Sequence, residues 1–402
     1  MRQLWAWLAV GVLSMELPAQ DWNRATFRGD EIDGRDFDYT DSYFLDVLSF
    51  TPSSSFAETW SNIETGVRGS IGSIRTDEFY TSHELRVRQE LVEGRGLAFR
   101  FGYLEGEDFD SRYRRFRAGI EQELMFGTRI SAWFEGTQLK EDNDFLLGLV
   151  HDGGPWRAEA SLGLVDFNDD KGKDGREFLR SAYATHLAFD WSPSLAWSFG
   201  ATLDAQLPME VVDPGEDLSF EFRKIRQSLR ASWRLGRRDV LQVETSFELS
   251  ASERLTLSDL ERRDRDREFY WPGLEWRHFY ENGVEASLIL KYFRLRENER
   301  RRLSLNEARM IDRHEAQVGI RLEAPLDDEW WLSPALWLAW VDLAEVYPLD
   351  GLENDRAHRI EAKIAVPFEW RPGPTVRLVI NPTFELDEPA FGGGNVQLVV
   401  GF

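Results

Sequence analysis

The chain has 402 residues, no cysteine and a formal net charge of -23, and 30% of its residues are charged. No long uninterrupted apolar run follows the first 20 residues, which excludes a helical membrane protein because each helical span needs about 20 apolar residues. The acidic balance argues against nucleic acid as a partner, and the absence of cysteine excludes a disulfide framework and thiol chemistry.

Residues 1–19 are typical of a signal peptide. Arg2 supplies the positive start, the stretch from Leu4 to Leu13 is an apolar core, and Leu17-Pro18-Ala19 fits a cleavage site. An N-terminal membrane anchor is the alternative, but the apolar run is too short to span a bilayer. We therefore expect an exported protein. Residues 20–61 are polar and irregular, with one apolar patch from Tyr43 to Phe50.

From about Asn62 onward, short segments alternate with a period of two residues. Leu97, Phe99 and Phe101 alternate with Ala98, Arg100 and Gly102, and the pattern recurs at 115–124, 156–164, 241–249 and 359–368. One face of each segment is apolar and the other is charged, which predicts strands and not helices.

The connections between these segments alternate between short and long. The short ones are Val92–Gly96, Phe126–Thr128, Asp152–Pro155, Ser192–Ser194, Gly236–Arg238, Glu281–Gly283, Pro325–Asp328 and Arg371–Pro374. The longer, more charged ones are Glu105–Asp110, Gln138–Asp144, Asn168–Arg176, Met209–Asp217, Ser252–Arg267, Glu297–Asp312, Ala344–Asp355 and Asp387–Gly394. Outer-membrane barrels have short turns on one side of the membrane and long loops on the other, whereas a soluble sandwich has no reason to sort its loops in this way.

The last eight residues form an alternating strand that stops on an aromatic residue. Val396, Leu398, Val400 and Phe402 share one face, opposite Gln397, Val399 and Gly401. This ending resembles that of bacterial outer-membrane β-barrel proteins of the porin-like kind, in which a final strand with a C-terminal Phe is the signal for the barrel assembly machinery. The resemblance implies an all-β fold, a transmembrane antiparallel up-and-down β-barrel in the bacterial outer membrane.

Counting segments back from Phe402 gives about 18 strands, with 16 or 20 as alternatives and both ends on the short-turn side. The barrel is then expected over residues 62–402. Residues 20–61 are either a periplasmic segment or a plug in the lumen. Aromatic residues near the short turns are expected to lie at the membrane interface, where amphipathic rings prefer to be. These are Trp156, Trp191, Tyr280, Trp330, Trp370 and Phe402.

If the apolar face contacts lipid, the charged face lines the interior. The lumen and constriction candidates are Arg115, Arg117, Glu121, Arg226, Arg230, Arg234, Glu244, Glu248, Arg277, Arg321, Arg359, Lys363 and Arg377. A three-residue turn at Gly236–Arg238 places Arg230 opposite Glu244 and Arg226 opposite Glu248. Such charges stay ionised only in water or in pairs, so a wide barrel predicts a polar channel. The alternative is that Arg/Glu ladders only brace the wall.

Catalytic and cofactor sites are not indicated. The six histidines are scattered without metal-ligand spacing, and Gly392-Gly393-Gly394 lacks the strand-then-helix setting of a phosphate loop. A surface hydrolase on a smaller barrel is an alternative without a nucleophile motif. We therefore expect no enzyme, cofactor or metal, and a channel for small hydrophilic solutes surrounded by outer-membrane lipid. An export barrel for an exopolysaccharide, or a plugged structural or surface-interaction barrel, are the alternatives.

Overall fold

The computed structural model describes most of the chain from Phe56 to the C-terminus. The described residues are 56, 59–60, 62–74, 78–108, 111–137, 143–164, 177–180, 183–214, 217–258, 260, 262–301, 307–346, 355–387 and 389–402. The expected signal peptide, the Tyr43–Phe50 patch and the expected loop Asn168–Arg176 lie outside these residues. Within the described part of the chain, no helix is both long and apolar enough to cross a membrane.

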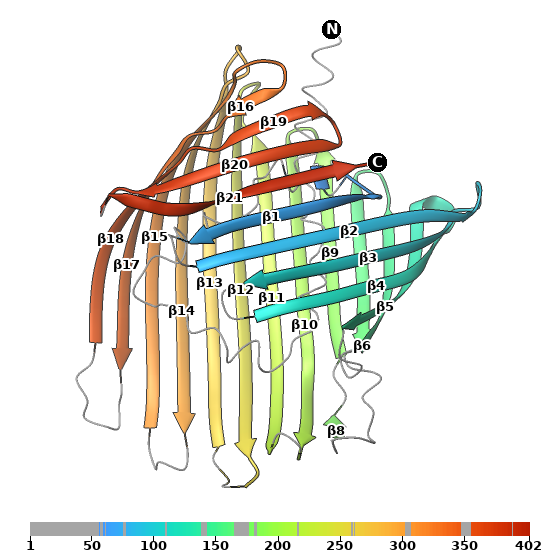
Figure 1. Ribbon diagram of the computed structural model, residues 1–402, viewed down its shortest axis with the longest axis vertical. Coiled ribbons are helices and arrows are strands. Elements are labelled where there is room, and N and C mark those ends of the chain that lie inside the picture. Colours follow the sequence, from blue (N-terminus) through green and yellow to red (C-terminus); the bar gives the residue numbers. More distant parts are fainter. Residues whose placement is uncertain are drawn as a thin grey trace.

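The described chain is built almost entirely from antiparallel strands (Figure 1). A single-turn 3-10 helix, η2 (Met125–Gly127), forms one of the turns. The strands are β1(Gly66–Ile74), β2(Glu78–Val92), β3(Leu97–Asp108), β4(Ser111–Glu123), β5(Thr128–Thr137), β6(Asn143–Asp152), β7(Trp156–Leu164), β8(Glu177–Arg180), β9(Tyr183–Ser194), β10(Trp197–Asp213), β11(Leu218–Arg234), β12(Asp239–Thr256), β13(Arg262–Phe279), β14(Glu285–Arg301), β15(Glu307–Pro325), β16(Trp330–Leu332), β17(Ala335–Val346), β18(Asp355–Ala365), β19(Phe368–Gly373), β20(Val376–Glu385) and β21(Ala390–Gly401).

The sheet closes on itself, because β1 pairs with β2 on one side and with β21 on the other. Among the described residues, the 21 segments occupy 18 positions in the wall, since β8 and β9, β16 and β17, and β18 and β19 each share one position. The predicted fold class and the count of about 18 strands are therefore confirmed.

Proline explains two of the interrupted strands. Pro334 lies in the gap between β16 and β17, and Pro367 lies in the gap between β18 and β19. Proline has no N–H to donate, so it breaks the ladder of hydrogen bonds within a sheet. The carbonyl oxygens of both prolines still accept hydrogen bonds from the neighbouring strands, from Leu322 N at 2.9 Å and Ser333 N at 2.9 Å respectively. The wall therefore stays continuous across each break.

The short turns lie where the sequence places them, with small shifts. The turn expected at Ser192–Ser194 is displaced, because β9 continues to Ser194 and the chain reverses before Trp197. Gly154, in the turn between β6 and β7, has a φ of +82°, a conformation that glycine adopts without steric cost. The C-terminus lies beside the start of β1 at the short-turn end of the barrel (Figure 1).

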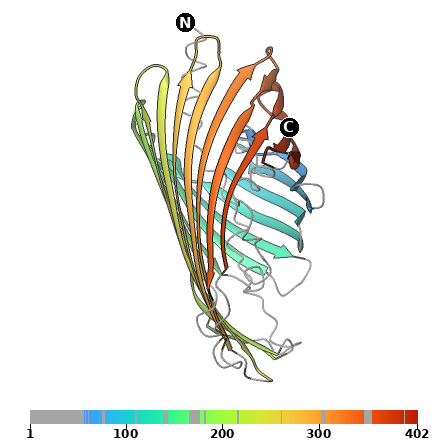
Figure 2. The ribbon, with the colours of Figure 1, turned by 90° about the vertical axis from the view of Figure 1, so that its left-hand side faces the viewer.

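The expected long loops are partly wrong. Strands β10 to β15 run for 17 to 19 residues and absorb most of the connections expected at Met209–Asp217, Ser252–Arg267 and Glu297–Asp312. A tilted strand needs only about 9 to 11 residues to cross a membrane. These strands therefore continue well beyond the bilayer, and they reach past the ends of β1 to β5 (Figures 1 and 2). We call the long-loop ends of β10 to β15, which continue beyond the bilayer, the extension.

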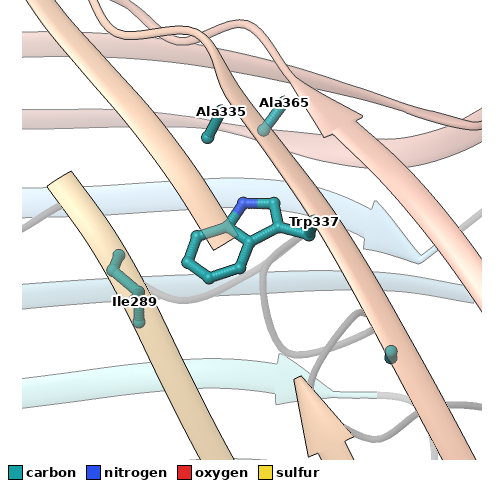
Figure 3. Packing of buried hydrophobic residues seen from close by; sticks show 5 residues of the cluster. Ile289, Ala335, Trp337 and Ala365 are labelled. Carbon is teal, nitrogen blue, oxygen red and sulfur yellow. The ribbon is translucent and has the colours of Figure 1, made fainter. Parts of the chain in front are cut away.

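Three inward-facing aromatic side chains pack over glycines of the neighbouring strand. The Trp337 indole covers Gly319, its direct partner across β15 and β17, and reaches Ile289 on β14 (Figure 3). Trp133 covers Gly119 and Tyr80 covers Gly72 in the same way. Each glycine leaves the space that the ring needs, and each ring shields a stretch of backbone that has no side chain of its own.

The Trp337 contact predicts the effect of adding one methyl group to Gly319. A Cβ at Gly319 would lie 2.1 Å from Trp337 Cζ3. We expect Gly319→Ala to lower the free energy of unfolding by about 1–3 kcal/mol, because the ring must leave its position. Urea unfolding in lipid vesicles, followed by heat-modifiable gel mobility, measures the change. Gly102→Ala is the matched control, since a Cβ there meets only ordinary contacts at 3.8 Å. Equal stability of the two variants would contradict this packing.

Candidate functional site

The outer face of the barrel is apolar over the middle of each strand. Leu229, Val243, Val318 and Leu338 are all exposed on this face, at 43–50% of their full area. Exposed apolar side chains in a contiguous band need an apolar surrounding, and a lipid bilayer provides one.

Aromatic residues border this band on the short-turn side. Trp156 pairs directly with Trp191 across β7 and β9, and the Trp330 and Trp370 rings stack with their centroids 6.3 Å apart. Tyr280 and Phe402 are exposed on the same rim, at 50% and 76%. Trp197 and Trp233, which were not predicted from the sequence, stack at 4.7 Å between β10 and β11. Trp197 directly follows the turn after β9 and Trp233 comes shortly before the Gly236–Arg238 turn, so their closeness to short turns was the signal that could have identified them.

The inner face of β2 to β5 carries one connected set of ion pairs. Glu121 is almost completely buried on β4 and accepts a hydrogen bond of 3.0 Å from Arg100 on β3. Arg88 on β2 and Arg129 on β5 approach the same carboxylate oxygen at 3.7 and 3.9 Å. One glutamate thus joins four neighbouring strands.

A second carboxylate on β5 holds the two other candidates of β4. Glu135 accepts a hydrogen bond of 2.8 Å from Arg117 Nε, and Arg115 Nη1 lies 3.6 Å from its other oxygen. Glu135 is 2% exposed, so its charge depends on these two arginines. The sequence analysis selected both arginines but missed this partner.

On β11 and β12 the predicted register is observed, with Arg230 opposite Glu244 and Arg226 opposite Glu248. Several contacts on these strands are diagonal or reach further. Lys224 Nζ lies 2.8 Å from Glu248, Arg230 lies 3.4 Å from Asp190 on β9, and Arg226 lies over the Trp271 ring of β13 at 5.1 Å.

Small residues on the intervening strand make these longer contacts possible. Gly200 on β10 lies between Arg230 and Asp190, its partners on the two flanking strands. Arg321 on β15 similarly crosses Ser287 of β14 to reach Glu275 of β13 at 2.9 Å. Long charged side chains therefore lie along the wall and connect next-nearest strands.

The short-turn rim holds a third group of charges. Arg371 lies 2.8 Å from Glu323 and 2.7 Å from Glu369, and its guanidinium group covers the Trp331 ring at 4.2 Å. Arg377 lies 3.5 Å from Glu369 and donates a hydrogen bond of 2.9 Å to Thr59 Oγ1.

The remaining candidates lie on the inner face without joining one ring. Arg277 reaches Gln242 at 3.5 Å, and buried Lys363 points its ammonium toward the carbonyl oxygen of Gly392 at 3.4 Å. Glu244 and Arg359 are exposed and Arg234 is half-buried. The described contacts thus gather on three parts of the wall, which are β2–β5, β9–β15 and the short-turn rim of β15, β16, β19 and β20.

In the extension the distribution of charge changes. Arg294 and Arg296 of β14 and Asp312 of β15 lie on the outer face, where Arg294 contacts Asp312 through two hydrogen bonds of 3.2 Å. The inner face holds Phe293 and Leu295. A charged outer surface indicates water outside, so the bilayer ends below these residues.

Buried ion pairs lie between the apolar residues of the inner extension. Glu297 is 1% exposed and lies 3.5 Å from Arg265 and 2.5 Å from Arg267. Glu299 lies 2.9 Å from Arg263 and 3.2 Å from Arg265. Within the described ranges, no group of three or more His, Asp or Glu side chains is placed to hold a metal ion.

No protein-family model and no curated protein matches the sequence. Solved structures similar to this chain include OccAB2 from Acinetobacter baumannii, at 10% identity and a TM-score of 0.46, covering 85% of this chain and 98% of that one. OprD from Pseudomonas aeruginosa has 10% identity and a TM-score of 0.45, covering 84% and 94%. A bacterial polysaccharide outer membrane secretin has 12% identity and a TM-score of 0.39, covering 84% and 97%.

A closed 18-strand wall with an apolar outer band and a charged inner face is the arrangement of a β-barrel that crosses a membrane. The chain is a closed, antiparallel transmembrane β-barrel. Its outer band contacts lipid, and its inner clusters of Arg and Glu face the lumen.

Proposed function

We propose that this barrel is a channel in the bacterial outer membrane, through which small hydrophilic solutes pass passively or with weak selectivity. The observation that supports this proposal is the charged inner wall of an 18-strand barrel. A barrel of this size is too wide for its own side chains to fill, and its inner charges stay ionised in contact with water. The channel needs no catalytic group, and the ion pairs set the field that a solute meets.

The distribution of charge supports a mild preference for cations at the mouth. Glu121, Glu135 and Glu297 each contact two or three arginines, so these inner clusters carry no net negative charge. Most of the net charge of -23 then belongs to the loops and strand ends. Acidic loops attract cations toward a pore entrance and repel polyanions.

Planar-bilayer recording tests the channel. We expect the purified, folded protein to produce discrete open steps in symmetric salt. A chain that ends before β21 is the matched control, because it loses both the β1–β21 and the β20–β21 pairing and cannot close. Folded barrels, identified by heat-modifiable gel mobility, that insert and remain silent would contradict passive transport.

Export of an exopolysaccharide is the second candidate. It is favoured by aromatic residues on the inner wall beside arginines, with Trp271 under Arg226 and Phe269 under Arg267 at 5.8 Å. Such a pair offers an apolar ring face and a cation to an acidic sugar. Adding acidic oligosaccharides to the bilayer chamber distinguishes the two candidates. Neutral oligosaccharides are the control. A current that acidic sugars block and neutral sugars do not block supports export, and a current that neither sugar changes supports a general channel.

A further inference from the structure

The end of the N-terminal segment lies against an apolar patch inside the barrel. Phe56, Trp60 and Ile63 form a buried cluster with Val379 of β20 and Val399 of β21. Both valines face inward, because their neighbours Ile380 and Leu398 are exposed on the outer face. Apolar residues on a wall that faces a polar lumen need a cover, and the three N-terminal side chains provide it.

Two guanidinium groups lie over the Trp60 ring. The Arg86 guanidinium lies 4.4 Å from the ring centroid and that of Arg68 lies 5.3 Å away. Glu84 joins the two arginines, at 2.5 Å from Arg68 and 2.7 Å from Arg86. The carboxylate keeps both guanidinium groups in place, so the wall offers a preformed slot for an aromatic ring.

Ile63 occupies a notch at the seam where the barrel closes. Gly66 and Gly401 are direct partners across β1 and β21. A Cβ at Gly66 would lie 2.6 Å from Ile63 Cγ2, and a Cβ at Gly401 would lie 2.9 Å from Ile63 Cγ1. Because both positions are glycine, the side chain of Ile63 has room here. The notch lies beside the last hydrogen bonds of the seam, including Phe402 N to Thr65 O at 3.0 Å.

The docked segment has one unfavourable feature. Trp60 is 1% exposed, yet among the described residues its indole N–H has no hydrogen-bond partner. A buried donor without an acceptor opposes docking, because in water the same N–H is solvated. Apolar and cation–π contacts therefore hold the segment in place, while the buried indole N–H without an acceptor lowers the free energy needed to release it.

We propose that Phe56, Trp60 and Ile63 form a releasable plug, docked at the short-turn mouth of the lumen through Trp60 in the Arg68–Arg86 slot. The plug narrows the channel at its periplasmic entrance while it is docked, and it frees that entrance when Trp60 leaves the slot. This function of the segment rests on the proposed channel, but its docking does not.

Thiol accessibility measures docking on its own. The chain has no cysteine, so Thr59→Cys introduces a single reactive group at a position that is 4% exposed. We expect slow modification by a small charged thiol reagent. Adding Trp60→Ala should raise the rate about tenfold, because the segment then opens locally without global unfolding. Trp60→Phe should keep most of the protection, since a ring remains in the slot. Trp191→Ala, on the outer rim, is the control and should change nothing.

Bilayer recording of the same variants tests occlusion. We expect Trp60→Ala to raise the mean conductance per inserted barrel at least threefold, and Phe56→Ala to act in the same direction if Trp60→Ala folds poorly. Equal thiol rates in the parent and Trp60→Ala overturn the docking. If the barrel conducts, and Trp60→Ala speeds thiol modification without changing the current, the segment docks but does not plug the channel. If no variant conducts while the thiol rates are as expected, the proposed channel is wrong and the docking is supported.

Discussion

Replacing Glu297 with glutamine is expected to lower the free energy of unfolding by about 3 kcal/mol, because it removes the shared partner of two buried arginines. Glu297 lies within 3.5 Å of Arg265 and 2.5 Å of Arg267. All three side chains are less than 10% exposed. Arg265 keeps its contact with Glu299 at 3.2 Å, but Arg267 loses the carboxylate that it contacts. A buried cation that loses its counter-charge costs several kcal/mol, whereas glutamine preserves the shape of the side chain and removes only the charge. Urea unfolding in vesicles is the measurement.

Glu268→Gln is the matched control for this prediction. Glu268 lies one position from Arg267 on the same strand, but it is exposed on the outer face of the extension. Its substitution should change the free energy of unfolding by less than about 0.5 kcal/mol. Arg267→Met combined with Glu297→Leu should recover most of the lost stability, since an apolar pair replaces a buried ion pair at little cost. Equal effects of Glu297→Gln and Glu268→Gln would mean that the extension is not packed on its inner face.

The extension also explains which part of the fold the sequence did not predict. Residues 262–268 alternate Arg263, Arg265 and Arg267 with Asp264, Asp266 and Glu268, and most of this stretch belongs to the charged connection expected at Ser252–Arg267. In the structure the arginines face inward and the acids face outward. The period of two was present, but it was carried by the sign of the charge. Hydrophobic alternation identifies strands only where one face contacts lipid or a core.

Strand β17 shows the opposite limit. Its sequence from Ala335 to Val341 is apolar at every position, so alternation cannot distinguish its two faces. The structure buries Trp337 and Ala339 on the inside and exposes Leu336 and Leu338 on the outside. Here the neighbouring strand decides the orientation, because Gly319 accepts the Trp337 ring. Such a fit depends on register, which is a property of two strands and not of one.

The candidate site was predictable as a face but not as a set of contacts. Register arithmetic placed Arg230 opposite Glu244, and the ladder has that register. It did not predict the contact between Arg230 and Asp190, two strands apart, which needs Gly200 between them. Glu135 is a different case, because it lies directly opposite Arg117 on the adjacent strand β5 and only its contact with Arg115 is diagonal. Long side chains on the inner wall can contact diagonal neighbours about 7–8 Å away, or reach across a small residue to the next strand. The residue directly opposite in register is therefore only one of several possible partners.

The largest functional effect is expected from removing the positive charges of β11. We expect the combined substitution of Arg226, Arg230 and Arg234 by alanine to raise the permeability ratio of cation to anion about three- to tenfold, since each charge contributes about 0.5 kcal/mol at 8 Å in water. The acids that contact this strand remain, among them Asp190 and Glu248, so the local field becomes negative. The reversal potential across a salt gradient at or below about 0.1 M is the measurement, because higher salt screens these charges.

Arg223→Ala separates the lumen charge from the charge of the strand as a whole. Arg223 belongs to β11 as well, but it is exposed on the outer face, whereas Arg230 faces inward. Arg223→Ala removes one positive charge from the outer face of β11, and Arg230→Ala removes one from the inner face of the same strand. Only the inward substitution should shift the reversal potential, because the field in a water-filled lumen is set by the charges that line it. A triple variant with unchanged reversal potential would place the selective part of the channel away from β11, at the Arg371 and Arg377 rim or at the Glu121 and Glu135 clusters.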